Sequence, residues 1–247
     1  MDNENHDVRD AVIIAAGKGS RLAGRGDLKP LIPVLDVPLI ERVIGAGMEA
    51  GLRRFWIVTG YRHQELGLFL NELRQRLGVW IEELYNDNWQ GSNGVSVLRA
   101  AGRLDRPFVL LMSDHLFDPE IIRGLCRHPL DGVDVWLAVD GDTSDRDLID
   151  IDDVTKVRVE DGRIADIGKH LSEFDAYDTG IFLCSPRLFD ALRTVVDDSG
   201  AASLSDGIRW LGTRRRAGVH DIGELFWMDV DDGAMLDLAE QLMSGRS

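Results

Sequence analysis

The chain has 247 residues, of which 44% are hydrophobic and 29% charged, so it can bury the core of one large α/β domain and stay soluble. Its formal net charge of −15 argues against general binding to nucleic acids or anionic membranes, because their phosphates would repel it. No apolar run approaches the length of a membrane span and the polar start is not a signal peptide, so we expect a cytoplasmic protein.

The first part of the chain alternates between short apolar runs and amphipathic segments. Residues 1–9 are polar and are expected to form a flexible tail before a single domain at 10–247. Helical spacing of apolar residues predicts helices within 39–48 and 66–77, and Asp118-Pro119 is typical of a helix start. Short apolar runs predict strands at 11–16, 55–59, 79–84, 108–112 and 133–139. This alternation predicts a mainly parallel sheet with helices on both faces, a Rossmann-like α/β fold.

The second part, from about residue 141, has a different pattern. Residues 154–160 and 163–167 flank Asp161-Gly162, which is a strong signal for a β-hairpin. Another strand is predicted at 179–184, followed by a helix that opens at Ser185-Pro186. We expect these antiparallel strands to extend the first sheet and to close over its carboxyl edge. No linker rich in Pro, Ser or Gly separates the two halves, about 10–140 and about 141–247.

A glycine-rich segment directly follows the first predicted strand, in the sequence AAGKGSRL. Glycines at such a turn let backbone N–H groups approach phosphate oxygens, and basic side chains add positive charge. A dinucleotide-binding turn requires a third glycine where Leu22 stands, and Lys18 does not end a Walker motif. The remaining interpretations are a phosphate-binding loop of another kind or a plain glycine turn.

The segment AAGKGSRLAGRGDLKPLIPV resembles the signature of the sugar-phosphate nucleotidyltransferase family, a Gly-rich loop followed by an arginine and a Lys-Pro pair. Leu28 departs mildly from the pattern, because many members have proline there. The resemblance implies that Arg21 holds the leaving phosphates and that Lys29 stabilises charge on the α-phosphate. It implies a nucleotide-binding set of Ala15, Ala16, Gly17, Gly19, Ser20, Arg21 and Lys29.

Two aspartates match the family's magnesium-binding positions. Asp114 follows the strand at 108–112, so it should lie at the carboxyl edge of the sheet, where α/β proteins bind ligands. Asp229, in the segment WMDVD, matches the second position, and Asp231 is its alternative. Taken alone, such aspartates could equally cap a turn or a helix. The resemblance implies that Asp114 and Asp229 hold Mg²⁺, while His115 is expected to be structural.

Further positions are assigned by the same resemblance. Lys169 matches the lysine that holds the acceptor phosphate, and Asp178, Thr179 and Gly180 match a turn that lines the acceptor pocket. A Gly-rich loop ahead of a helix, with Asn93, Gly94 and Ser96, can read the nucleobase through backbone groups. The alternatives are a solvated lysine and an ordinary turn. The implied catalytic set is Arg21, Lys29, Asp114 and Lys169.

From about Ala11 to about Asp232 the chain is most similar to the CTP:inositol-1-phosphate cytidylyltransferases. The similarity rests on Asn93–Ser96 and on the segments SDHLFDPEII, VTKVRVEDGRIADIGKHLSEFDAYDTGIF and WMDVDD. It implies a magnesium-dependent transfer from CTP to inositol-1-phosphate with release of pyrophosphate, the nucleotide bound by the first half of the chain and the acceptor by the second.

Several alternatives stay open at this point. The acceptor could be a sugar-1-phosphate, another cyclitol phosphate or choline phosphate, and the nucleotide GTP or UTP. Members of the group are often fused to a membrane phosphotransferase domain, which this sequence does not contain, so the pathway is open, as is the oligomeric state. An inactive nucleotide-binding relative is disfavoured because the charged site residues are retained. An NAD-dependent oxidoreductase is disfavoured by Leu22.

Overall fold

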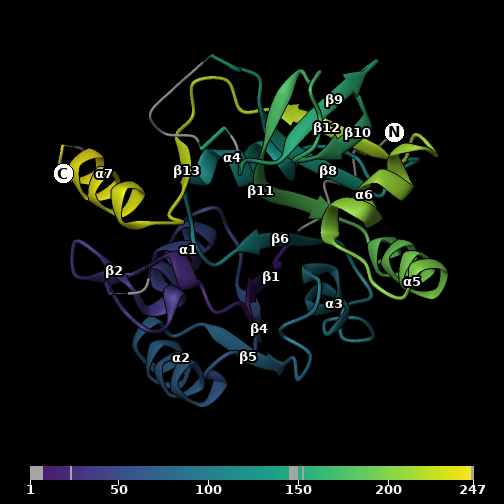
Figure 1. Ribbon diagram of the computed structural model, residues 1–247. Helices are drawn as coiled ribbons and strands as arrows, with labels where there is room; N and C mark the ends of the chain where they lie inside the picture. The colour runs from purple at the N-terminus through teal and green to yellow at the C-terminus, as the bar shows by residue number, and fades with distance from the viewer. Residues whose placement is uncertain (1–7, 23, 145–149, 152, 246–247) are drawn as a thin grey trace.

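The computed structural model describes residues 8–22, 24–144, 150–151 and 153–245 (Figure 1). Most of the expected tail at 1–9 lies outside this range, and only Val8 and Arg9 belong to it. Within the described residues, nine strands form one sheet that contains strands from both halves of the chain. In spatial order they are β5 (Trp80–Tyr85), β4 (Arg54–Thr59), β1 (Asp10–Ala15), β6 (Phe108–Met112), β11 (Ala176–Cys184), β8 (Val135–Asp140), β12 (Ala217–Asp221), β10 (Arg163–Gly168) and β9 (Lys156–Glu160).

The sheet is mixed, as the pattern predicts. Strands β5, β4, β1 and β6 pair in parallel, and so do β8 and β12. Strand β11 runs antiparallel to β6 and β8, and β10 runs antiparallel to β9 and β12. The predicted hairpin joins β9 to β10, with φ of 50° at Asp161 and 68° at Gly162, the left-handed conformation that tight hairpin turns require.

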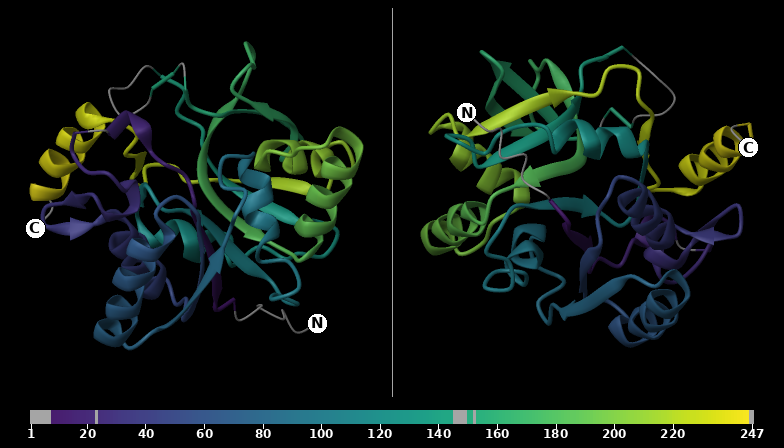
Figure 2. Two further views of the ribbon diagram at one scale, coloured as in Figure 1. Left: turned by 60° about the horizontal axis from the view of Figure 1, so that its bottom comes forward. Right: turned by 180° about the vertical axis from the view of Figure 1, so that it is seen from behind.

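Helices cover both faces of the sheet, which confirms the predicted architecture (Figure 2). Apolar residues of α1 (Leu39–Glu49), α2 (His63–Leu77) and α4 (Pro119–Leu125) bury one face. Those of α3 (Asn93–Leu98), α5 (Arg187–Ser199) and α6 (Leu204–Gly212) bury the other. Strand β1 serves both cores because alternate residues point to opposite faces, with Ile13 in the first core and Val12 in the second.

A third apolar cluster joins the end of the chain to its beginning. Helix α7 (Gly233–Ser244) packs near the two short 3₁₀ turns, η1 (Ser20–Leu22) and η2 (Lys29–Leu31), and the small ladder of β2 (Pro33–Val34) and β3 (Val37–Pro38). Strand β13 (Trp227–Asp229) pairs antiparallel with β7 (His115–Phe117). This pairing brings the WMDVD segment beside Asp114. Among the described residues, no helix is both long and apolar enough to cross a bilayer.

One local prediction is wrong. Asn93, Gly94 and Ser96 were expected in a loop ahead of a helix, but the structure places them inside α3 itself. Gly94 is buried because the backbone carbonyl of Ala202 lies so close that a Cβ would come within 2.4 Å of its oxygen. This close approach lets α3 pack against the segment that leads into α6.

Candidate active site

The glycine-rich segment leaves the carboxyl end of β1 and passes directly over Lys29. At Gly19, where φ is +62°, a Cβ would lie 2.4 Å from the Cβ of Lys29, so only glycine fits there. The Lys29 residue is 7% exposed. The loop therefore covers the aliphatic part of the lysine and leaves its amine facing the carboxyl edge of the sheet.

The amine of Lys29 joins two carboxylates from distant parts of the chain. Its Nζ lies 2.5 Å from Oδ2 of Asp114 and also contacts Asp231. Burial disfavours the charged amine, yet the two carboxylates raise the pKa of Lys29 above its ordinary value. Burial likewise opposes ionisation of Asp114, but Lys29 and His115 hold its pKa below the ordinary value. The pair is therefore fully charged at neutral pH.

Asp229 lies beside this pair without a cation of its own. It stands opposite His115 in the β7–β13 ladder, and Val230 N donates to the carbonyl of Asp114 at 3.0 Å. Its carboxylate makes no hydrogen bond or ion pair with any residue in the described part of the chain. Burial, with Asp231 and Asp114 nearby, raises its pKa. His115 and Lys29 oppose this rise in pKa without cancelling it, so a negative charge here is only partly compensated by the protein.

The donor set suits a hard divalent cation. Asp114 and Asp229 offer carboxylate oxygens from adjacent backbone segments, while Asp231 is already paired with Lys29 and with Arg21 at 2.8 Å. Within the described residues, no group of three or more potential ligands forms a complete metal site. Mg²⁺ is commonly held by only one or two carboxylates together with substrate phosphates and water. Two carboxylates, one of them unpaired, fit that pattern.

Asp153 joins the two remaining cations. Its carboxylate lies 2.7 Å from Nη2 of Arg21 and 2.5 Å from Nζ of Lys169. These contacts hold the pKa of Asp153 below its ordinary value, chiefly through the hydrogen bond from Lys169. The sequence reasoning missed Asp153, because an aspartate in the acidic segment DIDD looks like part of any solvated turn.

Only part of the predicted turn at 178–180 lines the expected acceptor pocket. Asp178 accepts a hydrogen bond from Gly180 N at 2.8 Å, and burial raises its pKa to about 6. Thr179 is buried and its hydroxyl donates to the carbonyl of Ala138 at 2.8 Å. Its side chain therefore does not line the pocket as expected. Its carbonyl accepts from Nδ1 of His115 at 2.9 Å, which supports a structural role for that histidine.

Two clefts meet at Asp114. The first, here named the glycine cleft, has a volume of about 250 Å³ and lies over Gly17, Gly19, Lys29, Trp89 and Ser96. The second, named the Lys169 cleft, has a volume of about 280 Å³ and is surrounded by Arg21, Asp153, Lys169, Asp178, Gly180, Asp229 and Asp231. Both clefts are also lined by Asn93, Met112 and Asp114. A larger cavity of about 440 Å³ between α1 and β7 is mainly apolar and lies apart from these cations.

The predicted site residues differ in which cleft they line. The four residues of the predicted catalytic set, Arg21, Lys29, Asp114 and Lys169, come together. Arg21 lies in the same cleft as Lys169 and shares Asp153 with it. Three of the predicted nucleotide-binding residues are buried and line neither cleft, namely Ala15, Ala16 and Gly94. The side chain of Ser20 lies outside the described part of the structure.

Comparison with known proteins decides the family. A model of the MobA-like NTP transferase domain matches residues 11–214. The chain belongs to this family. Members of such families generally use a divalent metal, which agrees with the unpaired carboxylate beside Asp114. The predicted membership of a nucleotidyltransferase family is thereby confirmed.

Relatives of this NTP transferase domain carry related names. The bifunctional IPC transferase and DIPP synthase of Rubrobacter xylanophilus is 34% identical over 239 residues, covering 95% of this chain and 52% of that protein. The protein of the same name from Thermococcus kodakarensis is 30% identical over 236 residues, covering 94% of this chain and 50% of that protein. The chain thus spans about half the length of these curated relatives.

Solved structures agree on the fold. The inositol-1-phosphate CTP transferase from T. maritima superposes with a TM-score of 0.85 at 26% identity, over 96% of each chain. A putative glucose-1-phosphate thymidylyltransferase from Bacillus anthracis gives a TM-score of 0.80 at 18% identity, over 94% of each chain. At that lower identity the likeness concerns the fold alone.

Proposed function

We propose that this NTP transferase domain joins CTP to inositol-1-phosphate, with Mg²⁺, and releases pyrophosphate. The observation that carries the proposal is the position of Asp114, which lines both clefts and is paired with the buried Lys29. A group held there reaches ligands in either cleft. The names of the Rubrobacter relative and of the T. maritima structure support the choice of CTP and inositol phosphate.

The glycine cleft suits the nucleotide. Gly17 has open space around its Cα, so phosphate oxygens can approach the backbone there. Lys29 supplies a fixed positive charge at the base of the cleft. Trp89 and Ser96 line the same space, and an aromatic face offers a stacking surface for a base. The nucleotide would lie with its base near α3 and its phosphates over the glycine-rich loop.

The metal would be held by Asp114 and Asp229. We assign the second ligand to Asp229 rather than Asp231 because Asp231 is already neutralised by Lys29 and Arg21. When bound, Mg²⁺ would neutralise phosphate charge and so allow two polyanions to approach each other in an acidic protein. The side chains of the two clefts would bind and orient the substrates.

The acceptor would occupy the Lys169 cleft, with its phosphate on Lys169. An oxygen of that phosphate attacks the α-phosphorus of CTP, and the bond from the α-phosphorus to the oxygen bridging to the β-phosphate breaks. Pyrophosphate leaves with the bonding electrons and CDP-inositol forms. No general base is required, because a phosphate monoester has its second pKa at about 6 and is largely ionised at neutral pH. Lys29 and Arg21 would stabilise the negative charge that develops on the phosphates.

Pyrophosphate release tests the proposal directly. Each of the four NTPs is combined with inositol-1-phosphate, glucose-1-phosphate or choline phosphate, in the presence of Mg²⁺. We expect the highest kcat/KM for CTP with inositol-1-phosphate. A preference for UTP or dTTP with glucose-1-phosphate would overturn the substrates and keep the nucleotidyltransferase. CTP binding without pyrophosphate release from any pair would identify an inactive relative instead.

A further inference from the structure

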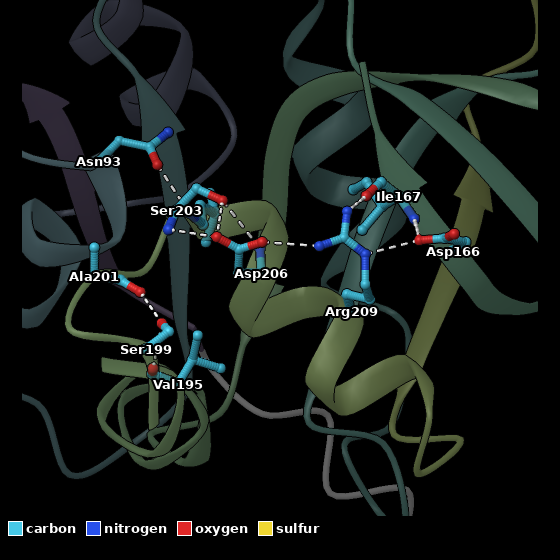
Figure 3. A network of polar contacts seen from close by, with 10 residues as sticks. Asn93, Asp166, Ile167, Val195, Ser199, Ala201, Ser203, Asp206 and Arg209 are labelled. Carbon is cyan, nitrogen blue, oxygen red and sulfur yellow. Dashed lines mark hydrogen bonds and ion pairs between the residues drawn. The ribbon is translucent and has the colours of Figure 1, made fainter. Parts of the chain in front are cut away.

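Helix α6 begins at the Lys169 cleft, and polar contacts connect it to Asn93 on α3 and to the end of β10 (Figure 3). Its first residues, Leu204 and Ser205, line the Lys169 cleft. The backbone N–H of Leu204 donates to Oδ1 of Asn93 at 2.8 Å, and Asn93 lines both clefts. The beginning of the helix therefore fixes the orientation of a side chain where the clefts meet.

The other end of α6 holds the strand that leads to Lys169. From α6, Arg209 donates through Nε to Oδ1 of Asp166 at 2.8 Å and through Nη2 to the carbonyl of Ile167. Both acceptors belong to the end of β10, directly before Gly168 and Lys169. A Cβ at Gly168 would lie 3.0 Å from Nη2 of Arg209, so the guanidinium rests against the backbone next to Lys169.

Arg209 also connects these two ends of the helix. Its Nη1 donates to Oδ1 of Asp206 at 2.8 Å. The other oxygen of Asp206 accepts from Ser203 N at 2.9 Å and from Ser203 Oγ at 2.6 Å, in a capping box that begins the helix. All three guanidinium nitrogens thus have separate acceptors, a geometry that suits the planar fork of arginine and not the single amine of lysine.

We propose that Arg209 is a positioning residue that places Lys169 for the acceptor phosphate. Arg209 is not among the described residues that line either cleft, so it acts through Lys169 and not on the substrate. The Lys169 side chain is 56% exposed and extends from a strand end, so its reach depends on where the backbone is held. The inference rests on the proposed function, since it assigns Lys169 to the acceptor.

Steady-state kinetics of Arg209→Lys test this role in the intact chain. The variant keeps the positive charge and loses the fork, so we expect the KM for inositol-1-phosphate to rise about tenfold, the equivalent of one weakened charge-assisted hydrogen bond between Lys169 and the phosphate. The KM for CTP should change much less. Arg193→Lys is the matched control, because Arg193 forms a similar ion pair with Asp190 on the exposed side of α5. It should leave both KM values unchanged.

A double-mutant cycle separates positioning from general weakening of the fold. In a Lys169→Ala background, Arg209→Lys should add little to the acceptor KM, because the group that Arg209 positions is gone. Thermal unfolding checks that each variant is folded. If Arg209→Lys is too unstable, Asp166→Asn replaces it, and a smaller rise in the same KM is expected because Asp166 is one of the acceptors that hold Arg209.

Each outcome has a distinct meaning. An unchanged acceptor KM in folded Arg209→Lys, or in Asp166→Asn where that variant replaces it, overturns the positioning role. An undiminished effect in the Lys169→Ala background overturns it as well. Absence of pyrophosphate release by the wild-type protein with every substrate pair would instead refute the proposed function. Equilibrium binding of inositol-1-phosphate would then still test the inference. Equal affinities of wild type and Arg209→Lys for this ligand would contradict it.

Discussion

The glycine cleft and the Lys169 cleft hold their cations in different ways. The Lys29 side chain is 8% exposed and contacts two carboxylates, whereas the Lys169 side chain is 56% exposed and contacts Asp153. A buried charge with fixed partners has one position before any ligand arrives. An exposed lysine on a strand end is placed by the backbone and by its neighbours. The nucleotide side is thus built in advance, and the acceptor side depends on support from α6 and β10.

The carboxylates where the clefts meet should give the largest effects. We expect Asp114→Asn and Asp229→Asn each to lower kcat about 10²-fold or more, the scale seen when a group that stabilises transition-state charge is removed. Asp231→Asn should lower kcat less, because Asp231 is neutralised by Lys29 and Arg21. Initial rates over a Mg²⁺ titration measure this. Near-normal kcat for Asp114→Asn at saturating Mg²⁺ would count decisively against the metal assignment.

The two exposed cations should divide their effects between the substrates. Lys169→Ala should raise the KM for the acceptor about tenfold, since a charge-assisted hydrogen bond to its phosphate is lost. Arg21→Ala should raise mainly the KM for CTP. Because both cations share Asp153, each variant frees that carboxylate to pair with the other cation. Kinetics with each substrate varied decide the matter, and a rise in the CTP KM alone for Lys169→Ala would reverse the assignment.

Variants at two glycines distinguish a role in ligand binding from a role in internal packing. Nothing lies within 4 Å of a Cβ at Gly17, so Gly17→Ala should change the free energy of unfolding by less than about 0.5 kcal/mol. It should nevertheless raise the KM for CTP, because the methyl group occupies the space where phosphates approach. Gly94→Ala should cost about 1–3 kcal/mol, because its Cβ would meet the Ala202 carbonyl at 2.4 Å. Urea unfolding together with KM measurements tests both variants. A stable Gly17→Ala variant with an unchanged KM for CTP would show that the phosphates do not bind at this loop.

The sequence could predict those parts of the site that depend on local patterns, and it could not predict those that depend on long-range strand pairing. Gly17 and Asp114 follow the buried strands β1 and β6, so a local pattern places them at the carboxyl edge of the sheet. Lys29 lies in the turn η2 and was assigned by the resemblance alone. The pairing of β7 with β13 joins segments far apart in the chain, and no local pattern shows it. The resemblance to known enzymes supplied Asp229, but only the fold reveals that its carboxylate lacks a partner while Asp231 has two.

Two predictions from the sequence are wrong for local physical reasons. Helix α3 has six residues, too few for its apolar spacing to distinguish it from a turn. Thr179 was placed in the pocket, but the register of β11 against β8 shifts between Asp178 and Phe182. Such an irregularity breaks the alternation of side chains along a strand, so the direction of Thr179 cannot be read from its position.

Asp178 provides the smallest expected effect and a test of the acceptor side alone. Burial raises its pKa from 3.8 to about 6. The folded state therefore binds a proton more tightly than the unfolded state does. The stability that the protonated form provides is fully present below pH 4 and is lost as the pH rises through about 6. Above that pH the protein carries a partly buried carboxylate charge at a cost in stability.

Asp178→Asn removes this charge and keeps the shape of the side chain. We expect the variant to gain stability relative to wild type at pH 8 and to show a smaller difference at pH 4.5, measured by urea unfolding. The KM for inositol-1-phosphate should rise at pH 8, because an amide is a weaker acceptor than a carboxylate for ring hydroxyls. Asp190→Asn, an exposed carboxylate on α5, is the control for both readouts. An equal difference in stability at the two pH values would contradict the raised pKa, whereas an unchanged acceptor KM would exclude Asp178 from the acceptor pocket.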